Sequence, residues 1–162
     1  MACLVTIPFV GGALAGAPAQ GGETGSKAKL TCEVPAIKDG HFTPEVMWAM
    51  GRLGGYAVSP DGLRLAYTVT RYDVKANKGW SDLFVKELTS GKVKQLTDFS
   101  AQVYNIEWSP SGELRFVSSH EGTPQIYKMQ ADGTGLTCLS NVPDGVDGFR
   151  YAPDGKHIAY VS

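Results

Sequence analysis

Short runs of alternating apolar and polar residues, separated by turn residues, fill the chain from residue 55 onward. Such alternation is typical of β-strands that bury one face of a sheet. Three of these runs follow the same kind of turn: Ser59-Pro60-Asp61-Gly62, Ser109-Pro110-Ser111-Gly112 and Ala152-Pro153-Asp154-Gly155. In each turn proline presets the first corner, and glycine takes the left-handed position that follows. The pattern therefore predicts three hairpins of one design.

The spacing of these turns indicates a repeat, because their prolines lie 50 and 43 residues apart. Strand-rich units of about 40 to 50 residues are the signature of propeller blades. A second hairpin is repeated as well, since Phe84 to Leu96 and Tyr127 to Leu139 are both twelve residues. We therefore predict an all-β fold: a partial, TolB- or WD40-like β-propeller with two four-stranded blades, the start of a third and a short N-terminal helix.

The second turn is one residue shorter than the other two. A slip of one residue within a strand would move every side chain to the opposite face of the sheet. We therefore place the missing residue in the turn. This alignment predicts that Tyr67, Phe116 and Tyr160 occupy equivalent buried positions.

The N-terminal residues differ from the rest in composition. Residues 1–19 carry no charge and end in the cleavage pattern Ala17-Pro18-Ala19, which predicts a secretory signal peptide, although a basic start is missing. An unstructured tail is the alternative. The expected organisation is a signal peptide at 1–19, a flexible leader at 20–41, a helical lead-in at 42–54 and an incomplete propeller at 55–162. Its blades are expected at about 55–102, 103–145 and 146–162.

Three local expectations concern the first part of the chain. Residues 30–34 alternate and suggest a short strand. Thr43 is a plausible helix N-cap with Pro44 in the first helical position, and the apolar side chains of Val46, Met47 and Met50 are expected in the core. A polar loop at 71–79 is six residues longer than its counterpart in the second blade. Such an insertion often forms a binding rim, and a solvated excursion is the alternative.

Charge and cysteine content exclude several classes of function. Fifteen Lys and Arg nearly cancel sixteen Asp and Glu, so no basic stripe indicates nucleic-acid binding. Of three cysteines, Cys3 would leave with the signal peptide. Cys32 and Cys138 could pair in an oxidising compartment, but we favour two buried or idle thiols. No Cys/His spacing suggests zinc.

No catalytic, cofactor-binding or metal-binding residue is assigned, and no cofactor is expected. Ser81 lies in Gly79-Trp80-Ser81-Asp82-Leu83, which approaches a nucleophile elbow but ends in Leu and enters a strand, so we interpret it as structural. None of His41, His120 and His157 is placed beside a candidate nucleophile. The segment 144–148 lacks the further ligands of a calcium loop and is expected to be an inter-blade turn.

Four segments together resemble the N-terminal part of S9 (prolyl oligopeptidase-family) serine peptidases, closest to the dipeptidyl-peptidase 5 and acylaminoacyl-peptidase-like branch. They are the helical lead-in from Phe42 to Trp48, the first turn with its strand, the long loop 72–79, and Thr89-Ser90-Gly91 followed by Gln95-Leu96-Thr97. The turn repeat alone is shared with TolB-like propellers. The lead-in with its long loop is more specific to the peptidases.

The resemblance implies a propeller that shields a C-terminal α/β-hydrolase domain, whose Ser-Asp-His triad carries its Ser on a Gly-x-Ser-x-Gly elbow. This sequence has no such elbow, so the chain alone is expected to be inactive. The third unit stops inside its second strand, so a fragment of a longer protein is expected.

The parent is expected to be periplasmic or secreted and to release short N-terminal units from oligopeptides, while this portion gates and scaffolds. Its expected partners are an oligopeptide substrate and the hydrolase domain, and the parent could form a homodimer. No nucleic acid and no membrane span are expected. The alternative is a TolB-like periplasmic protein-binding module, and a weaker one is a sugar- or ligand-binding propeller.

Overall fold

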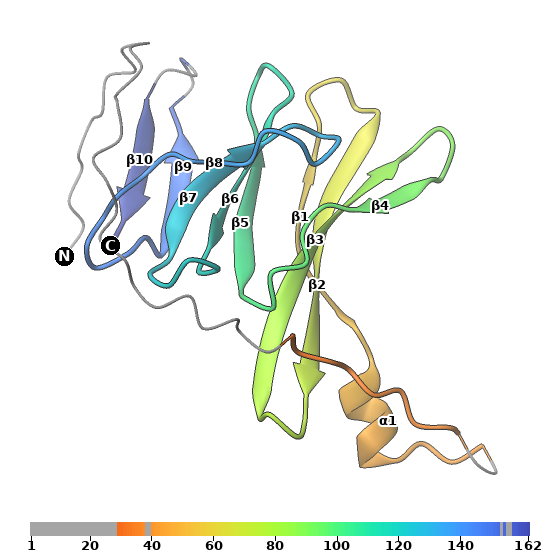
Figure 1. Cartoon of the computed structure of the whole chain (residues 1–162). Helices are drawn as coiled ribbons and strands as arrows, with labels where there is room; N and C mark the ends of the chain where they lie inside the picture. The colour runs from red at the N-terminus through yellow and green to blue at the C-terminus, as the bar shows by residue number, and fades with distance from the viewer. Residues whose placement is uncertain (1–28, 38–39, 153, 155–156) are drawn as a thin grey trace.

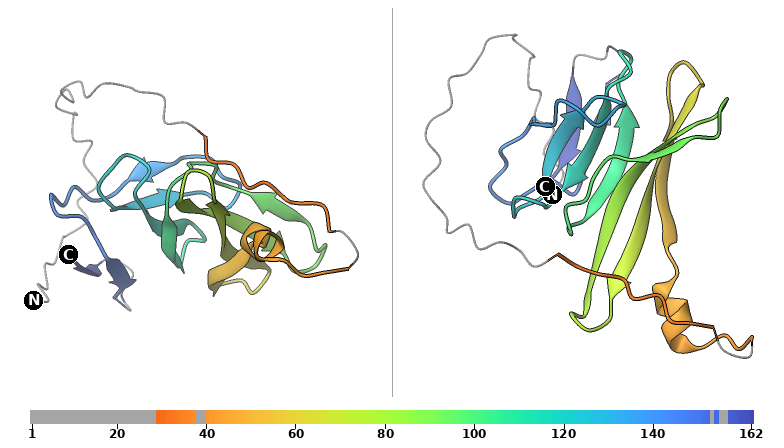
Figure 2. Two further views of the ribbon diagram at one scale, coloured as in Figure 1. Left: turned by 90° about the horizontal axis from the view of Figure 1, so that it is seen from below. Right: turned by 45° about the vertical axis from the view of Figure 1, so that its right-hand side comes forward.

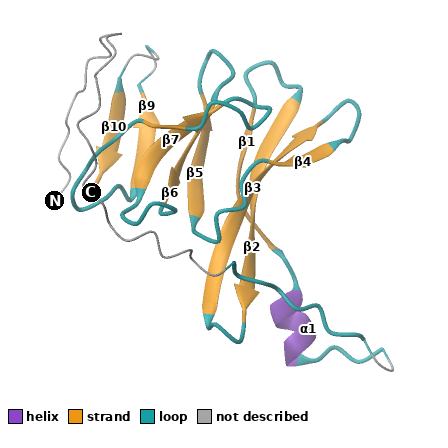
Figure 3. Cartoon of the chain, in the orientation of Figure 1, coloured by secondary structure: helices purple, strands orange, loops and turns teal. Residues whose placement is uncertain are grey.

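Three antiparallel sheets and one short helix make up the computed structural model, which describes residues 29–37, 40–152, 154 and 157–162 (Figure 1). Figure 3 shows how completely strands and their loops dominate the described chain. This arrangement confirms the predicted all-β partial propeller. The predicted signal peptide at 1–19 and Cys3 lie outside the described residues.

Helix and strand bounds follow the chain order. The helix is α1 (Pro44–Ala49). The first sheet contains, in spatial order, β1 (Arg52–Val58), β2 (Arg64–Asp73), β3 (Lys78–Glu87) and β4 (Val93–Gln95). The second contains β5 (Val103–Trp108), β6 (Leu114–Ser118), β7 (Gln125–Met129) and β8 (Thr137–Cys138). The third pairs β9 (Gly148–Tyr151) with β10 (Ile158–Val161).

The sheets stand beside one another like neighbouring blades, and Figure 2 shows this from two further sides. The first strand of each sheet lies next to the first strand of its neighbour, since β1 contacts β5 and β5 contacts β9. The order of strands within a sheet then runs away from this common side. This is the blade-by-blade arrangement expected of a propeller.

Strand register confirms that the missing residue of the second repeat lies in its turn. Val58 pairs with Leu65 across the first turn, whereas Trp108 pairs with Leu114 across the second, one residue shorter. The glycines of both turns are left-handed, with φ of 70° at Gly62 and 82° at Gly112. The equivalent aromatic pairs are preserved, because Tyr67 lies opposite Phe84 and Phe116 opposite Tyr127.

Two apolar cores lie between the sheets. The first joins the facing sides of the first two sheets and contains Ala66, Leu83, Val85, Val103, Ile106, Leu114, Phe116, Tyr127 and Met129. The second joins the far side of the second sheet to the third and contains Val117, Ile126, Val146 and Phe149. Each core therefore forms where two neighbouring sheets face each other.

Burial of the aligned aromatic residues differs from the prediction. Phe116 is fully buried, but Tyr67 and Tyr160 are only partly buried. Tyr160 packs against the second core. Tyr67 points to the side of the first sheet that no other described sheet covers, so its equivalence in sequence does not give it equivalent burial.

Several local predictions for the lead-in also need correction. Thr43 caps α1 and Pro44 opens it as expected, but the helix ends at Ala49 and β1 already begins at Arg52, inside the predicted helical lead-in. No residue of α1 is buried, and Met47 is 41% exposed, so its apolar side does not enter the core. The predicted strand at 30–34 is absent from the described segment 29–37, which makes isolated hydrogen bonds instead of a ladder.

Candidate functional site

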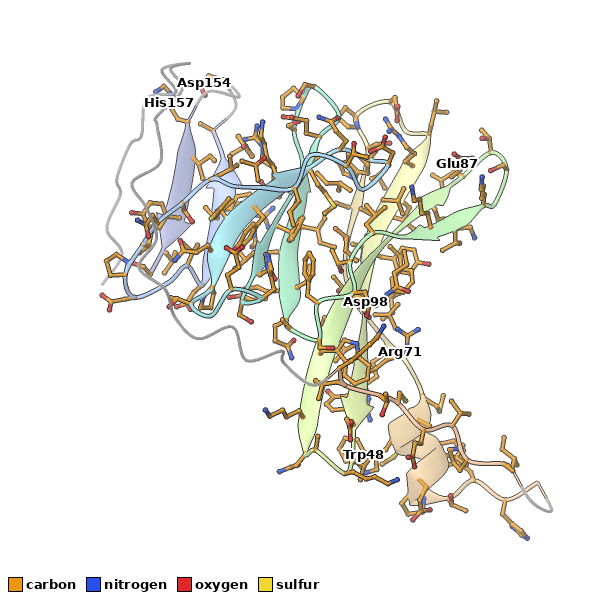
Figure 4. All side chains as sticks on the ribbon, in the orientation of Figure 1. Trp48, Arg71, Glu87, Asp98, Asp154 and His157 are labelled. Carbon is orange, nitrogen blue, oxygen red and sulfur yellow. The ribbon has the colours of Figure 1, made fainter. Side chains whose placement is uncertain are left out.

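A hollow of about 550 Å³ lies at the end of the first sheet where α1 is attached. Three stretches of chain form it: the segment before α1, α1 itself and the tip of the β2–β3 hairpin. Its lining residues are Thr31, Glu33, Val34, Pro35, Pro44, Glu45, Trp48, Ala49, Tyr72, Asp73, Val74 and Lys75. Figure 4 labels Trp48, a residue of α1, at this end of the molecule. The volume is in the range of pockets that bind small ligands.

One wall of the hollow is a hairpin, at the place where the sequence predicted a loop at 71–79. Strands β2 and β3 remain paired as far as Asp73 and Lys78, so the extra residues lengthen the hairpin and leave only a short turn at 74–77. Asn77 closes this turn with φ of 51°, a conformation that asparagine tolerates better than most residues. The insertion is therefore an ordered projection that carries side chains to the hollow, and the expectation of an extended loop was wrong.

Near the tip of this hairpin, Tyr72 on β2 is paired with Gly79 on β3. A Cβ atom at position 79 would lie 2.9 Å from the Tyr72 ring, which is too close for an alanine without displacement of the ring. The glycine inside β3 thus leaves the space that the tyrosine fills.

An aromatic and cationic group stands at the border of the hollow. The Arg52 guanidinium lies 4.6 Å from the centre of the Tyr72 ring and 5.1 Å from that of Trp48. The two rings contact each other edge to face, with their centres 5.3 Å apart. Cation–π contacts of this kind hold a guanidinium in place without neutralising it.

The segment 29–35 is fastened by polar contacts to the connection between β4 and β5 and to the first sheet. The Lys29 ammonium pairs with Asp98, and the Leu30 N–H donates to the Ser100 hydroxyl at 3.1 Å. Further along, the Thr31 N–H donates to Asp73 at 3.2 Å. Backbone N–H groups, first that of Ala76 and then that of Thr31, lower the pKa of the Asp73 carboxyl. Asp73 therefore stays charged at neutral pH and ties the segment to the hairpin.

A buried carboxylate lies beside this fastening. Asp82 is 2% exposed, accepts a hydrogen bond from the Trp80 indole at 3.0 Å and lies 3.7 Å from the Arg71 guanidinium. Its Oδ1 atom has no hydrogen-bond partner among the described residues. Burial raises the pKa of the Asp82 carboxyl, and the neighbouring charge of Asp98 acts in the same direction.

The structure does not bring Ser81 and the histidines together as a catalytic triad. Ser81 lies in the middle of β3, where its hydroxyl contacts Thr70 at 2.9 Å and Gln102 at 3.1 Å. His120 stacks on Phe99 with ring centres 4.2 Å apart, and His157 pairs with Asp154 in its own turn (Figure 4). His41 is exposed before α1. These four residues therefore lie in separate environments.

The loop and thiol predictions can be compared with the structure in the same way. The segment 144–148 ends the connection from β8 to β9 and includes Gly148, the first residue of β9. The Gly145 N–H donates to the Val142 carbonyl at 3.0 Å, as in an inter-blade turn. Cys32 and Cys138 are both unpaired, and Cys138 is exposed rather than buried. Within the described residues no group of three or more His, Cys, Asp or Glu side chains is arranged to hold a metal ion.

Sequence comparison relates the chain to peptidases. No protein-family model matches it. Dipeptidyl-peptidase 5 of Porphyromonas endodontalis is 30% identical over 122 residues, and that of Porphyromonas gingivalis is 34% identical over 122 residues. These matches confirm the resemblance to S9 peptidases. Each covers 75% of this chain but only 18% of the relative, so the chain spans less than a fifth of their length.

Solved structures support the propeller fold of this chain. TolB from Acinetobacter baumannii superposes with a TM-score of 0.52 at 27% identity, over 65% of this chain and 25% of that one. The acylaminoacyl peptidase of Pyrococcus horikoshii superposes with a TM-score of 0.56 at 15% sequence identity, over 67% of this chain and 17% of that one. At the latter identity the likeness shows the fold alone. The chain is thus similar both to peptidase propellers and to TolB propellers.

Sequence reasoning did not identify the group formed by Trp48, Arg52 and Tyr72. One signal was available: Thr70, Tyr72 and Trp80, close to the turn at 74–77, are residue types enriched in strands, which favours a longer hairpin over a loop. The position of the helix relative to that hairpin could not be obtained from the pattern. That position is what brings Trp48 to Tyr72.

Proposed function

We propose that this chain is the N-terminal propeller portion of a secreted S9 serine peptidase that cleaves short N-terminal units from oligopeptides. In this proposal the propeller gates access and supports an α/β-hydrolase domain that carries the catalytic triad outside these 162 residues. The observation that carries the proposal is the match of 122 residues with dipeptidyl-peptidase 5 from two species.

The uncovered side of the first sheet supports a larger assembly. Tyr56 is 72% exposed there, while the residues at its equivalent positions in the second and third sheets, Ile106 and Phe149, are 8% and 3% exposed. An apolar column that is buried in two blades and open in one is what a propeller shows when a further blade covers the open face.

The test uses the whole coding region from which the chain derives. We expect the full-length product to hydrolyse dipeptidyl reporter substrates, and a Ser→Ala change in its Gly-x-Ser-x-Gly elbow to abolish that activity. The 162-residue chain alone is expected to show no turnover. A coding region with no hydrolase domain, or a full-length protein without peptidase activity, would overturn the proposal.

Secretion is tested separately, by N-terminal sequencing of the mature protein from a periplasmic or culture fraction. The expected first residue is Gln20, because the predicted cleavage site precedes it. In the part of the chain that the structure describes, no helix is long and apolar enough to cross a membrane. A product that retains Met1 in the cytosolic fraction would contradict secretion.

A second candidate function is a TolB-like periplasmic protein-binding propeller. The TolB superposition at 27% identity specifically favours it. A coding region that ends after the last blade, with a product that co-purifies with a defined protein partner and shows no peptidase activity, would support this alternative.

A further inference from the structure

Arg52 differs from the other four arginines of the chain in its surroundings. Each of the others has a carboxylate partner: Arg64 with Asp61 at 3.0 Å, Arg71 with Asp82 at 3.7 Å, Arg115 with Glu113 at 3.5 Å and Arg150 with Glu107 at 2.7 Å. Arg52 makes no ion pair with any residue that the structure describes, and its contacts are with the Trp48 and Tyr72 rings. Within the part of the chain that the structure describes, its charge is therefore held in place but not neutralised.

The ring contacts leave the hydrogen-bonding capacity of the guanidinium unused. A guanidinium carries five N–H donors in its own plane, and contact with an aromatic ring does not satisfy them as an oxygen acceptor would. No hydrogen bond from Arg52 to a described residue satisfies them. The side chain thus offers a planar set of N–H donors, which matches the two oxygens of a carboxylate.

Local backbone features keep this group in place. Gly79 leaves room for the Tyr72 ring on the neighbouring strand. Gly51 lets β1 approach β2, since a Cβ there would lie 2.8 Å from the Val69 side chain. Thr43 caps the helix that presents Trp48, with its hydroxyl accepting from the Val46 N–H at 3.4 Å. The group formed by Trp48, Arg52 and Tyr72, here called the clamp, therefore does not depend on a bound anion for its shape.

The hollow supplies the rest of a binding site. Trp48 and Tyr72 belong both to the clamp and to the lining of the hollow, so the guanidinium lies at its border. The lining combines apolar residues, among them Val34 and Val74, which are 80% and 65% exposed, with the charged residues Glu33, Glu45, Asp73 and Lys75. An apolar side chain could fill this space while an adjoining carboxylate reaches Arg52.

We propose that Arg52 binds the C-terminal carboxylate of a short peptide whose last side chain occupies the hollow. The choice of a peptide rests on the proposed function, in which this propeller meets oligopeptides. The carboxylate would take two parallel hydrogen bonds from the guanidinium, and the Trp48 and Tyr72 rings would shield them from water. The site would then retain the far end of a peptide at this end of the first sheet.

The test measures binding of two matched probes to the 162-residue chain by NMR titration. The probes are N-acetyl-Ala-Ala-Leu with a free carboxylate and the same peptide as its C-terminal amide. We expect the acid to bind roughly 10- to 100-fold more tightly than the amide, the range that a charge-assisted hydrogen-bonded pair provides. Shifts should be confined to Trp48, Tyr72 and the lining of the hollow.

Variants separate the proposed role from simple loss of folding. Arg52→Gln should abolish the preference for the acid, while Arg52→Lys, which keeps the charge but not the fork, should retain only part of it. Arg64→Gln is the matched control, because Arg64 also lies over an indole, that of Trp108 at 5.2 Å, but is already paired with Asp61. It should keep the full preference, and near-UV circular dichroism should confirm that all variants are folded.

Equal binding of acid and amide would overturn the proposal, as would an undiminished preference in folded Arg52→Gln. Shifts that cluster away from the hollow would also overturn it. Because the titration needs no catalysis, its failure is distinct from a failure of the peptidase proposal, which is decided by the activity of the full-length protein.

Discussion

The same aromatic pair occurs in two sheets with different surroundings. Tyr67 stacks on Phe84 with ring centres 5.6 Å apart and planes at 17°, and Phe116 stacks on Tyr127 at 6.1 Å and 21°. Phe116 and Tyr127 are 0% and 2% exposed because the first sheet covers them, whereas Tyr67 and Phe84 are only partly buried. The pairing of rings is thus set within a blade, and their burial is set by the next blade.

The open face of the first sheet is not uniformly exposed. Tyr56 and Val58, on the first strand, are 72% and 53% exposed. Near the hairpin tip, however, Trp80 and Asp82 are 5% and 2% exposed, and the segment beginning at Lys29 is fastened close by. This face therefore has a covered end and an uncovered end, and only the uncovered end lacks a partner among the described residues.

The largest effect on stability is expected from a substitution that breaks the covered aromatic pair, Phe116 and Tyr127. Phe116→Ala should lower the free energy of unfolding by about 3–5 kcal/mol, the usual cost of a large cavity in a close-packed core. Phe84→Ala removes the same atoms from the partly open pair and should cost only about 1 kcal/mol. Urea unfolding monitored by fluorescence measures both. Equal losses would show that the two pairs are equally buried in solution.

A smaller effect is expected at the contact between the first two sheets. The Trp108 indole N–H donates to the Ala57 carbonyl at 3.0 Å. Trp108→Phe removes this hydrogen bond and should cost about 1 kcal/mol in the same urea experiment. Val58 occupies the equivalent position in the first sheet, so Val58→Ala should change stability by about 0.5 kcal/mol or less. A larger loss for Val58→Ala would mean that something covers it.

At the covered end of the open face, the buried Asp82 should make the stability of the protein depend on pH. Because burial raises the pKa of Asp82, the folded protein holds this proton more tightly than the unfolded chain does. This carboxyl therefore makes stability fall as pH rises from its ordinary value of 3.8 through its raised folded value, and the effect is complete above that value.

Asp82→Asn should flatten that part of the stability profile and should not destabilise the protein at pH 7. The amide oxygen can still accept from Trp80, and the cost of the buried charge is removed. Thermal melts between pH 3 and 7 compare the two proteins. If the difference in melting temperature between the two proteins stayed the same from pH 3 to pH 7, Asp82 would be solvated and the covered end would be open.

The smallest effect on stability is expected at the uncovered end. Tyr56→Ser should change the free energy of unfolding by about 0.5 kcal/mol or less, since the ring is mostly in water. It should also reduce any self-association, because it shrinks an exposed apolar patch. Sedimentation velocity at increasing concentration measures this. Marked destabilisation by Tyr56→Ser would place the ring in a core that the described residues do not show.

The turn chemistry and strand spacing were enough to predict the fold. Pro60 and Gly62 specify a tight turn through local backbone preferences, and the two-residue period of a strand then decides which side chains share a face. The short second turn could be located for the same reason, because a slip inside β6 would have reversed Phe116. These are local constraints, and no distant contact was needed to infer them.

The failed predictions all depended on contacts between separate elements. The apolar side of α1 was expected in the core, but Met47 and Met50 remain exposed because the helix meets only the end of the first sheet. The insertion at 71–79 was expected to be a loop, but pairing with β3 extends it as a hairpin. Propensity alone cannot decide such cases, since tertiary contacts override it.

The sequence by itself determined the blade repeat, the turn types, and the strand register and side-chain faces next to the repeated turns. Only the tertiary structure decided which of those faces is covered, and it alone brought Trp48, Arg52 and Tyr72 together beside the hollow. The physical reason is that backbone preferences act over a few residues, whereas burial depends on a second surface. The sequence of one blade does not show whether that surface is present.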